Sequence, residues 1–209
     1  MRRFITCAFV CLLMAGSAST LAADRRNLEL CGDRQRPDVA LRACNRIVGD
    51  PRETSEGRAQ ALYYRGMIYF QNRDADRAMA DFDAAIRLNP RDAMAFNNRG
   101  SVHKMKGDRQ RAIADYSEAI RLDRTNAMAY RNRGVLYVGI DNNRALADFN
   151  EAVWLDPKNA YGLLWRGAVH ATMGNEDSAE ADWDEATRLD PQGADAFFKT
   201  LERARRQDD

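Results

Sequence analysis

Histidines, cysteines and carboxylates are the side chains that catalysis or metal binding would use here. His103 and His170 stand far apart in the chain, and the glycines form no phosphate-binding loop. No serine or cysteine stands in a motif that would pair it with a base. We therefore expect no catalytic residue, no metal site, no cofactor and no enzymatic activity.

The N-terminal segment has the features of an export signal. Arg2 and Arg3 precede an apolar run that ends at Ala15, and mostly small residues follow up to Ala23. A membrane-spanning helix needs about 20 apolar residues, more than this run offers. The pattern predicts a signal peptide over 1–23, cleaved after Ala22 or Ala23, and a periplasmic or secreted protein. An uncleaved anchor is the alternative.

Cys31 and Cys44 are the cysteines that remain after cleavage. A lone pair in an exported chain predicts a disulfide, and two reduced, buried thiols are the alternative. The spacing is not Cys-x-x-Cys, so it does not indicate a redox or zinc motif.

The overall charge narrows the class of partner. The chain has 32 Lys and Arg against 31 Asp and Glu, and 45% of its residues are hydrophobic. A near-neutral chain is not suited to coating nucleic acid or anionic lipid, and a chain this apolar is not expected to be disordered. We expect an ordered protein with no nucleic-acid partner and no membrane insertion after cleavage.

The elements that position these side chains form a repeat. Four segments align when they start at Ala59, Ala93, Ala127 and Ala160, so the steps are 34, 34 and 33 residues. Each has Arg-Gly at positions seven and eight, Ala at twenty, an aromatic residue at twenty-four and Ala at twenty-seven. Apolar residues at three- and four-residue intervals predict two antiparallel helices in each segment. No segment buries its apolar face alone, so stacking of neighbours must do so.

This pattern resembles the tetratricopeptide repeat family. The resemblance implies an all-α fold, an α-solenoid with a right-handed superhelix built of helix-turn-helix repeats. Arg124 replaces the usual proline in one repeat, and a one-residue deletion near Gly139 shortens one turn. The predicted parts are a signal peptide (1–23), a divergent N-terminal cap or half repeat with the disulfide (24–58), four repeats (59–92, 93–126, 127–159 and 160–193) and a C-terminal capping helix with a tail (194–209).

Two features follow from the alignment. An Arg at position seven recurs with an Asp at position twenty-three, as in Arg65 and Asp81. We interpret these as ion pairs between facing helices, because an unpaired buried guanidinium would be very costly; a binding ladder of arginines is the alternative. In the same register Cys31 and Cys44 fall at positions eleven and twenty-four, where other repeats place facing rings.

The resemblance also implies a binding groove. Positions two, five, six, nine and twelve of the first helices would line it, with Asn98 and Asn132 as the two rungs of an asparagine ladder for peptide backbone. Solvated helix surface is the other interpretation of these asparagines. The predicted groove residues are Tyr63, Tyr64, Met67, Asn97, Asn98, Ser101, Arg131, Asn132, Tyr161 and Trp165.

Two functions remain open at this point. The leading hypothesis is a protein-binding adaptor or scaffold that holds an extended peptide segment of its partner in the groove. The alternative is a structural subunit of a cell-envelope assembly that docks through its convex face and Trp154, which replaces an arginine found in the sibling repeats. Neither the partner nor the oligomeric state is predicted by the sequence.

Overall fold

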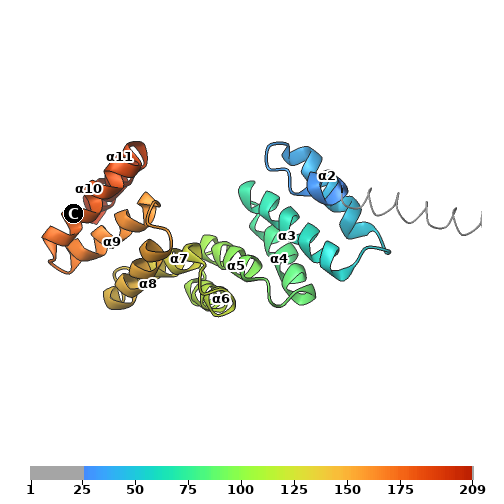
Figure 1. Cartoon of the computed structure of the whole chain (residues 1–209), viewed down its shortest axis with the longest axis horizontal. Helices are drawn as coiled ribbons and strands as arrows, with labels where there is room; N and C mark the ends of the chain where they lie inside the picture. The colour runs from blue at the N-terminus through green and yellow to red at the C-terminus, as the bar shows by residue number, and fades with distance from the viewer. Residues whose placement is uncertain (1–25, 209) are drawn as a thin grey trace, which may run out of the picture. The chain divides into compact units, whose positions relative to one another are not determined.

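A computed structural model describes residues 26–208, and the elements in that range are helices joined by short turns (Figure 1). The predicted signal peptide lies outside the described residues. Among the helices that are described, none combines the length and apolar character that a membrane span requires. The bounds are α2 (Pro37–Gly49), α3 (Ser55–Gln71), α4 (Ala75–Leu88), α5 (Ala93–Met105), α6 (Arg109–Leu122), α7 (Ala127–Tyr137), α8 (Asn142–Leu155), α9 (Ala160–Thr172), α10 (Glu176–Leu189) and α11 (Pro191–Asp208).

The chain divides into two compact units, one up to Val102 and one from His103 onward. In the first unit, α3 packs on α4 and α2 packs on α3. In the second, α7 pairs with α8 and α9 with α10, while α11 packs against both α9 and α10. The predicted all-α fold of successive helix pairs is confirmed.

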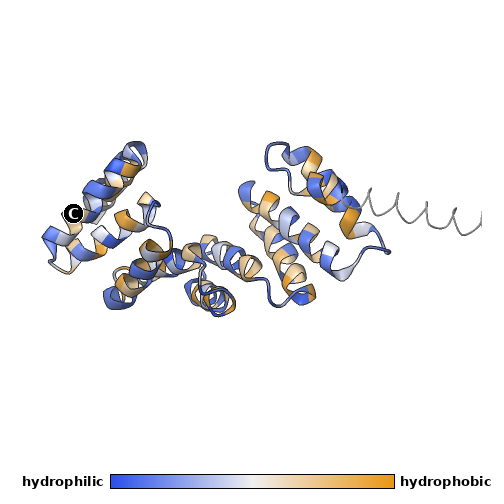
Figure 2. Ribbon diagram, viewed as in Figure 1, coloured by the Kyte–Doolittle hydropathy of each residue, from blue (hydrophilic) through white to orange (hydrophobic). Residues whose placement is uncertain are grey.

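Small residues let the two helices of a pair approach closely. A Cβ added at Gly134 of α7 would lie 3.1 Å from the ring of Phe149 on α8, and Ala145 on α8 is fully buried. Figure 2 shows apolar and polar residues interleaved along each helix, as a helix with one buried face requires. The repeated Gly and Ala positions are therefore contact points between paired helices.

The second helix of a pair begins at an Asp-x-x-Arg sequence in three repeats. The side chains of Asp74, Asp108 and Asp141 each accept a hydrogen bond from the backbone N–H three residues on, as N-caps do. The arginine at that third position also pairs with the capping carboxylate in each case. The helix starts are thus fixed by local polar contacts.

The turn inside each pair needs a left-handed residue. Gly107 and Gly174 have φ of +78°, and Arg73 takes the same place in the first repeat with φ of +59°. In the repeat with the deletion α7 ends at Tyr137, and Gly139 takes this role with φ of +74°. Glycine adopts such angles without the strain that a side chain adds.

The N-terminal cap packs on the first repeat. The Cys31 and Cys44 sulfurs lie 2.02 Å apart and their Cα atoms 4.8 Å apart. Both are buried in a cluster with Ile47 of α2 and Ile68 of α3. Helix α3 begins at Ser55, before the predicted repeat start at Ala59, because Thr54 caps it by accepting from the Gly57 N–H.

Candidate functional site

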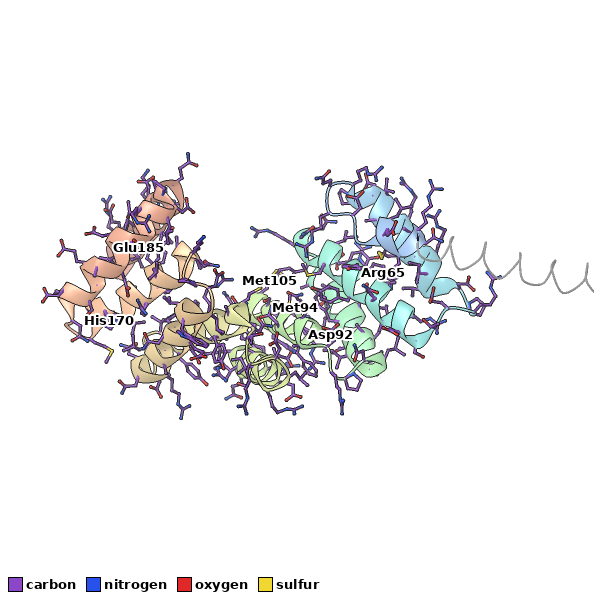
Figure 3. All side chains as sticks on the ribbon, viewed as in Figure 1. Arg65, Asp92, Met94, Met105, His170 and Glu185 are labelled. Carbon is purple, nitrogen blue, oxygen red and sulfur yellow. A yellow bond between two sulfur atoms is a disulfide. The ribbon has the colours of Figure 1, made fainter. Side chains whose placement is uncertain are left out.

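The arginines at position seven join helices and leave no free ladder. In Arg65 (Figure 3), Arg133 and Arg166, Nε and Nη2 donate to both carboxylate oxygens of an aspartate on the paired helix, at 2.6–2.9 Å. These hydrogen bonds raise the pKa of Arg65 and of Arg133. The partner aspartates are almost fully buried. The interpretation as structural ion pairs is confirmed.

The remaining nitrogen, Nη1, reaches back to the preceding helix pair. Its acceptors all stand at position twenty-five of the unit before, a connection that the sequence interpretation missed although that position is always polar. The acceptors are Asn45 for Arg65, Asp83 for Arg99, Ser117 for Arg133 and Asn150 for Arg166. Because Asn45 lies on α2, the cap behaves as the second helix of a repeat.

The predicted groove positions of the first unit are largely occupied by contacts within the chain. Asn97 is fully buried and Asn98 is 7% exposed, and the Asn98 amide donates to the Tyr63 hydroxyl at 3.0 Å. Burial raises the pKa of Tyr63. Ser101 donates its hydroxyl to the Asn97 carbonyl oxygen, at 3.1 Å. The polar groups here hold the repeats together.

Tyr64 and Met67 lie where the first repeat meets the cap. The Tyr64 ring meets the Tyr63 ring edge-on, with centroids 5.5 Å apart. A Cβ added at Gly32 would lie 3.4 Å from Tyr64 Cζ, so the ring packs closely on the cap. Both Tyr64 and Met67 line a small pocket beside Cys31. These two side chains bound the cap interface as well as the predicted groove.

The second unit carries an aromatic cluster on α9. Trp165 stacks on Phe149 with centroids 6.4 Å apart, and it meets the edge of Phe197 from α11 at 5.2 Å. Tyr161, one turn earlier on α9, contacts both Trp165 and Phe197 edge-on and is 49% exposed. The indole N–H of Trp165 is buried without a hydrogen-bond partner among the described residues. Tyr161 is thus the solvent-exposed member of an aromatic cluster whose other rings hold it in place.

One cation contacts this cluster, and a second cation interacts electrostatically with the first. The Arg131 guanidinium lies over the Tyr161 ring, 5.5 Å from its centroid. Burial lowers the pKa of Arg131, whereas the charge of Asp156 acts in the opposite direction. Burial, and after it the charge of Arg131, lowers the pKa of Lys104. Asn132, which follows Arg131 in the chain, is half-buried.

In the second unit, the predicted groove positions of the first helix of each pair form a surface that we call the A-helix face. It comprises Lys104, Met128, Arg131, Asn132, Val135, Tyr161 and Trp165. Leu164 of α9 is 1% exposed and belongs to the core instead.

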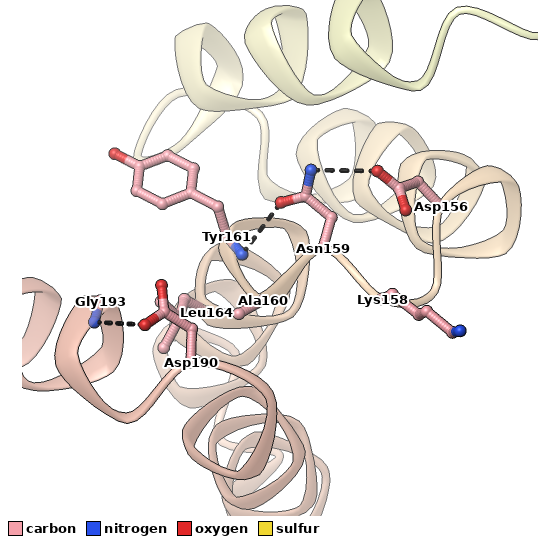
Figure 4. A pocket seen from close by; sticks show the side chains of 8 residues that line it. All are labelled: Asp156, Lys158, Asn159, Ala160, Tyr161, Leu164, Asp190 and Gly193. Atoms are coloured by element: carbon pink, nitrogen blue, oxygen red, sulfur yellow. Dashed lines mark hydrogen bonds between the residues drawn. The ribbon is translucent and has the colours of Figure 1, made fainter.

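A pocket of about 350 Å³ lies at the start of α9 (Figure 4). Its polar groups serve the backbone of the helices that begin there. Asn159 accepts from the Tyr161 N–H and donates to Asp156, and Asp190 accepts from the Gly193 N–H. These contacts account for the polarity of the pocket, so we assign it no ligand.

Trp154 on α8 is 75% exposed. In two sibling repeats the corresponding residues, Arg121 and Arg188, pair with a glutamate three positions earlier. Among the described residues, Trp154 is the most exposed large apolar side chain.

The two histidines are less exposed than Trp154. The ring of His103 lies against Asp115 at 3.7 Å, and Nδ1 of His170 is buried without a partner among the described residues.

Comparisons with known proteins agree with this architecture. Residues 32–93 and 63–127 match the family model described as Tetratricopeptide repeat. Curated protein sequences give no significant match. Three solved structures are similar in fold, at identities that show the fold alone.

The first is MamA 41-end from Desulfovibrio magneticus RS-1, with 22% identity, a TM-score of 0.66, and coverage of 81% of this chain and 94% of that one. TTC0263, a thermophilic TPR protein in Thermus thermophilus, has 18% identity and a TM-score of 0.65, and 85% and 98% are covered. The first TPR of Spaghetti (RPAP3), bound to the HSP90 peptide SRMEEVD, has 21% identity and a TM-score of 0.55, and 57% and 95% are covered.

Proposed function

The chain belongs to the tetratricopeptide repeat family, and from this premise we propose that it is a non-enzymatic adaptor that binds an extended segment of a protein partner. The fold itself is that of a protein–protein interaction module. One structural neighbour carries a bound peptide, which supports peptide binding as the mode. The observation that carries the proposal is the half-exposed Tyr161, held by Trp165 and Phe197 on the A-helix face.

We assign contact with the partner to some of the predicted groove residues and not to others. Tyr161 offers the exposed half of its side chain to a partner, and Trp165 contacts its ring edge-on. Rigid aromatic side chains lose little entropy on binding, and they dominate many protein interfaces. Asn132 is half-buried and is the asparagine through which we propose contact with peptide backbone. Asn97 and Asn98 are engaged in packing, so we assign them no contact with the partner.

A site-specific crosslink tests the proposal. The photoreactive amino acid p-benzoylphenylalanine is introduced in place of Tyr161 and, separately, in place of Trp154, and cells are irradiated. We expect a discrete crosslinked partner from the Tyr161 position and none from the Trp154 position. Crosslinking at both sites equally would contradict a specific role for the A-helix face.

The structural-subunit alternative rests on the 75% exposure of Trp154. It predicts the reverse pattern, with a crosslink from Trp154 and none from Tyr161. In that case Trp154→Arg, which restores the sibling residue, should release the chain from its assembly.

We also propose that the chain is exported and that Cys31 and Cys44 form a disulfide. The 4.8 Å distance between their Cα atoms, which is within the range for disulfides, and the export features of residues 1–23 support this. Mass spectrometry of the cell-envelope fraction should show a mature N-terminus at Ala23 or Asp24 and a mass two hydrogens below that of the reduced chain. Two free thiols that react with a maleimide under denaturing, non-reducing conditions would refute the disulfide.

A further inference from the structure

Arg131 and Arg133 stand two residues apart on α7 and have different surroundings. Arg133 donates to both oxygens of Asp148 and to the Ser117 hydroxyl. Within the described residues, Arg131 forms no hydrogen bond or ion pair. Its guanidinium lies over the face of the Tyr161 ring. A half-buried guanidinium over an aromatic ring keeps its donors available at the ring's edge.

Lys104, in the last turn of α5, adds a second positive charge that interacts electrostatically with Arg131. It likewise forms no hydrogen bond or ion pair among the described residues, and its pKa is lowered partly by the charge of Arg131. Two like charges that interact on a partly buried surface disfavour each other's charged form. An anion bound to both would offset this repulsion. Asp156, the carboxylate whose charge acts on Arg131, is itself bound to the Asn159 amide.

The remainder of the A-helix face is apolar or amide. Its other side chains are Met128, Asn132, Val135, Tyr161 and Trp165, none of which carries a charge. The second unit as a whole has more carboxylates than Lys and Arg residues. The positive charge of this face is therefore local, and it is placed beside an exposed aromatic ring.

We infer that the A-helix face of the second unit recognises an aspartate or glutamate side chain next to an apolar side chain in the partner's segment. Arg131 and Lys104 hold the carboxylate, and the Tyr161 ring with Met128 receives the apolar neighbour. The planar guanidinium matches a carboxylate through two parallel hydrogen bonds, which favours this anion. The inference rests on the proposed function and specifies the chemistry of the segment.

A synthetic peptide pair tests the inference. The probe is a fluorescein-labelled twelve-residue peptide of alternating Glu and Leu with an amidated C-terminus, and its control has Gln in place of every Glu. Binding to the mature chain is followed by fluorescence anisotropy at low salt. We expect the Glu peptide to bind at least about tenfold more tightly than the Gln peptide, and raised salt to remove most of the difference.

Variants then locate the site. Arg131→Gln and Lys104→Gln should each weaken binding of the Glu peptide about tenfold and leave the Gln peptide unchanged. Arg121→Gln is the matched control, because it removes the same charge from an exposed arginine of α6, which pairs with Glu118 of the same helix. Thermal unfolding of each variant shows that the fold is kept.

Equal binding of the two peptides would overturn the inference, and so would equal weakening by Arg121→Gln and Arg131→Gln, which would indicate a general charge effect. The crosslink from Tyr161 depends on neither cation. If that crosslink forms but Arg131→Gln changes no affinity, the inference alone fails. If no crosslink forms at Tyr161, the proposed function fails.

Discussion

The same repeat positions are used differently in the two units. In the first unit, Asn98 donates to Tyr63, and Asn97 is fully buried. In the second unit, Arg131 and Lys104 have no acidic partner bonded to them among the described residues, and Tyr161 is half-exposed. One surface has satisfied its polar groups within the chain, while the other leaves charge and aromatic area available. Repeat position alone therefore does not decide which residues bind a partner.

The largest predicted effect is a difference in stability between variants of two arginines on α7. Arg133→Ala leaves the buried carboxylate of Asp148 without its partner and should lower the free energy of unfolding by about 3 kcal/mol. Arg131→Ala removes no hydrogen bond, only the contact with the Tyr161 ring, and should lower that free energy by about 1 kcal/mol at most. Urea unfolding followed by circular dichroism measures both. Similar losses from the two variants would mean that Arg131 is structural too, and the contrast between the units would disappear.

A smaller effect is expected from the asparagine–tyrosine contact of the first unit. Asn98→Ala leaves the hydroxyl of the half-buried Tyr63 without its donor and should cost about 1–2 kcal/mol of unfolding free energy. Tyr63→Phe removes the other partner, so the double variant should lose less than the sum of the two single losses, with a coupling of about 1 kcal/mol.

Asn132→Ala is the matched comparison in the second unit, since Asn132 occupies the same repeat position and is half-buried. We expect it to reduce peptide affinity. Additive losses for Asn98 and Tyr63 would show that their hydrogen bond contributes nothing measurable.

The repeat architecture was predictable because every helix pair needs the same close contacts. Gly134 must lack a side chain beside Phe149, and the equivalent glycine and aromatic residue recur at equivalent positions along the chain. The ion pairs of Arg65, Arg133 and Arg166 were predictable for the same reason. A constraint that acts in every repeat leaves a periodic trace in the sequence.

The differences between the surfaces were not predictable in this way. Asn98 and Asn132 share position six, yet the burial of Asn98 depends on a tyrosine that the preceding repeat happens to supply. Trp165 contacts Phe197 of α11, which lies outside the repeat register. Such contacts do not repeat from one helix pair to the next among residues 26–208, so no periodicity reveals them. That Arg131 forms no ion pair within residues 26–208 likewise follows only from where the neighbouring carboxylates lie.

The smallest effect concerns pH and distinguishes Lys104 from Arg131 within the cationic pair. The pKa of Lys104 is lowered from its ordinary value of 10.5, by burial and then by the charge of Arg131, so this ammonium loses its proton at a lower pH than a free lysine. A bound carboxylate favours the charged form, and affinity for the Glu peptide should therefore be full at pH 7 and fall severalfold as pH rises toward 10.5. Lys104→Arg should remove most of this decline, because a guanidinium stays charged throughout the range. Anisotropy titrations at constant ionic strength measure the effect. If the variant and the natural chain decline together, the pH dependence arises elsewhere, and Arg131 alone would hold the carboxylate.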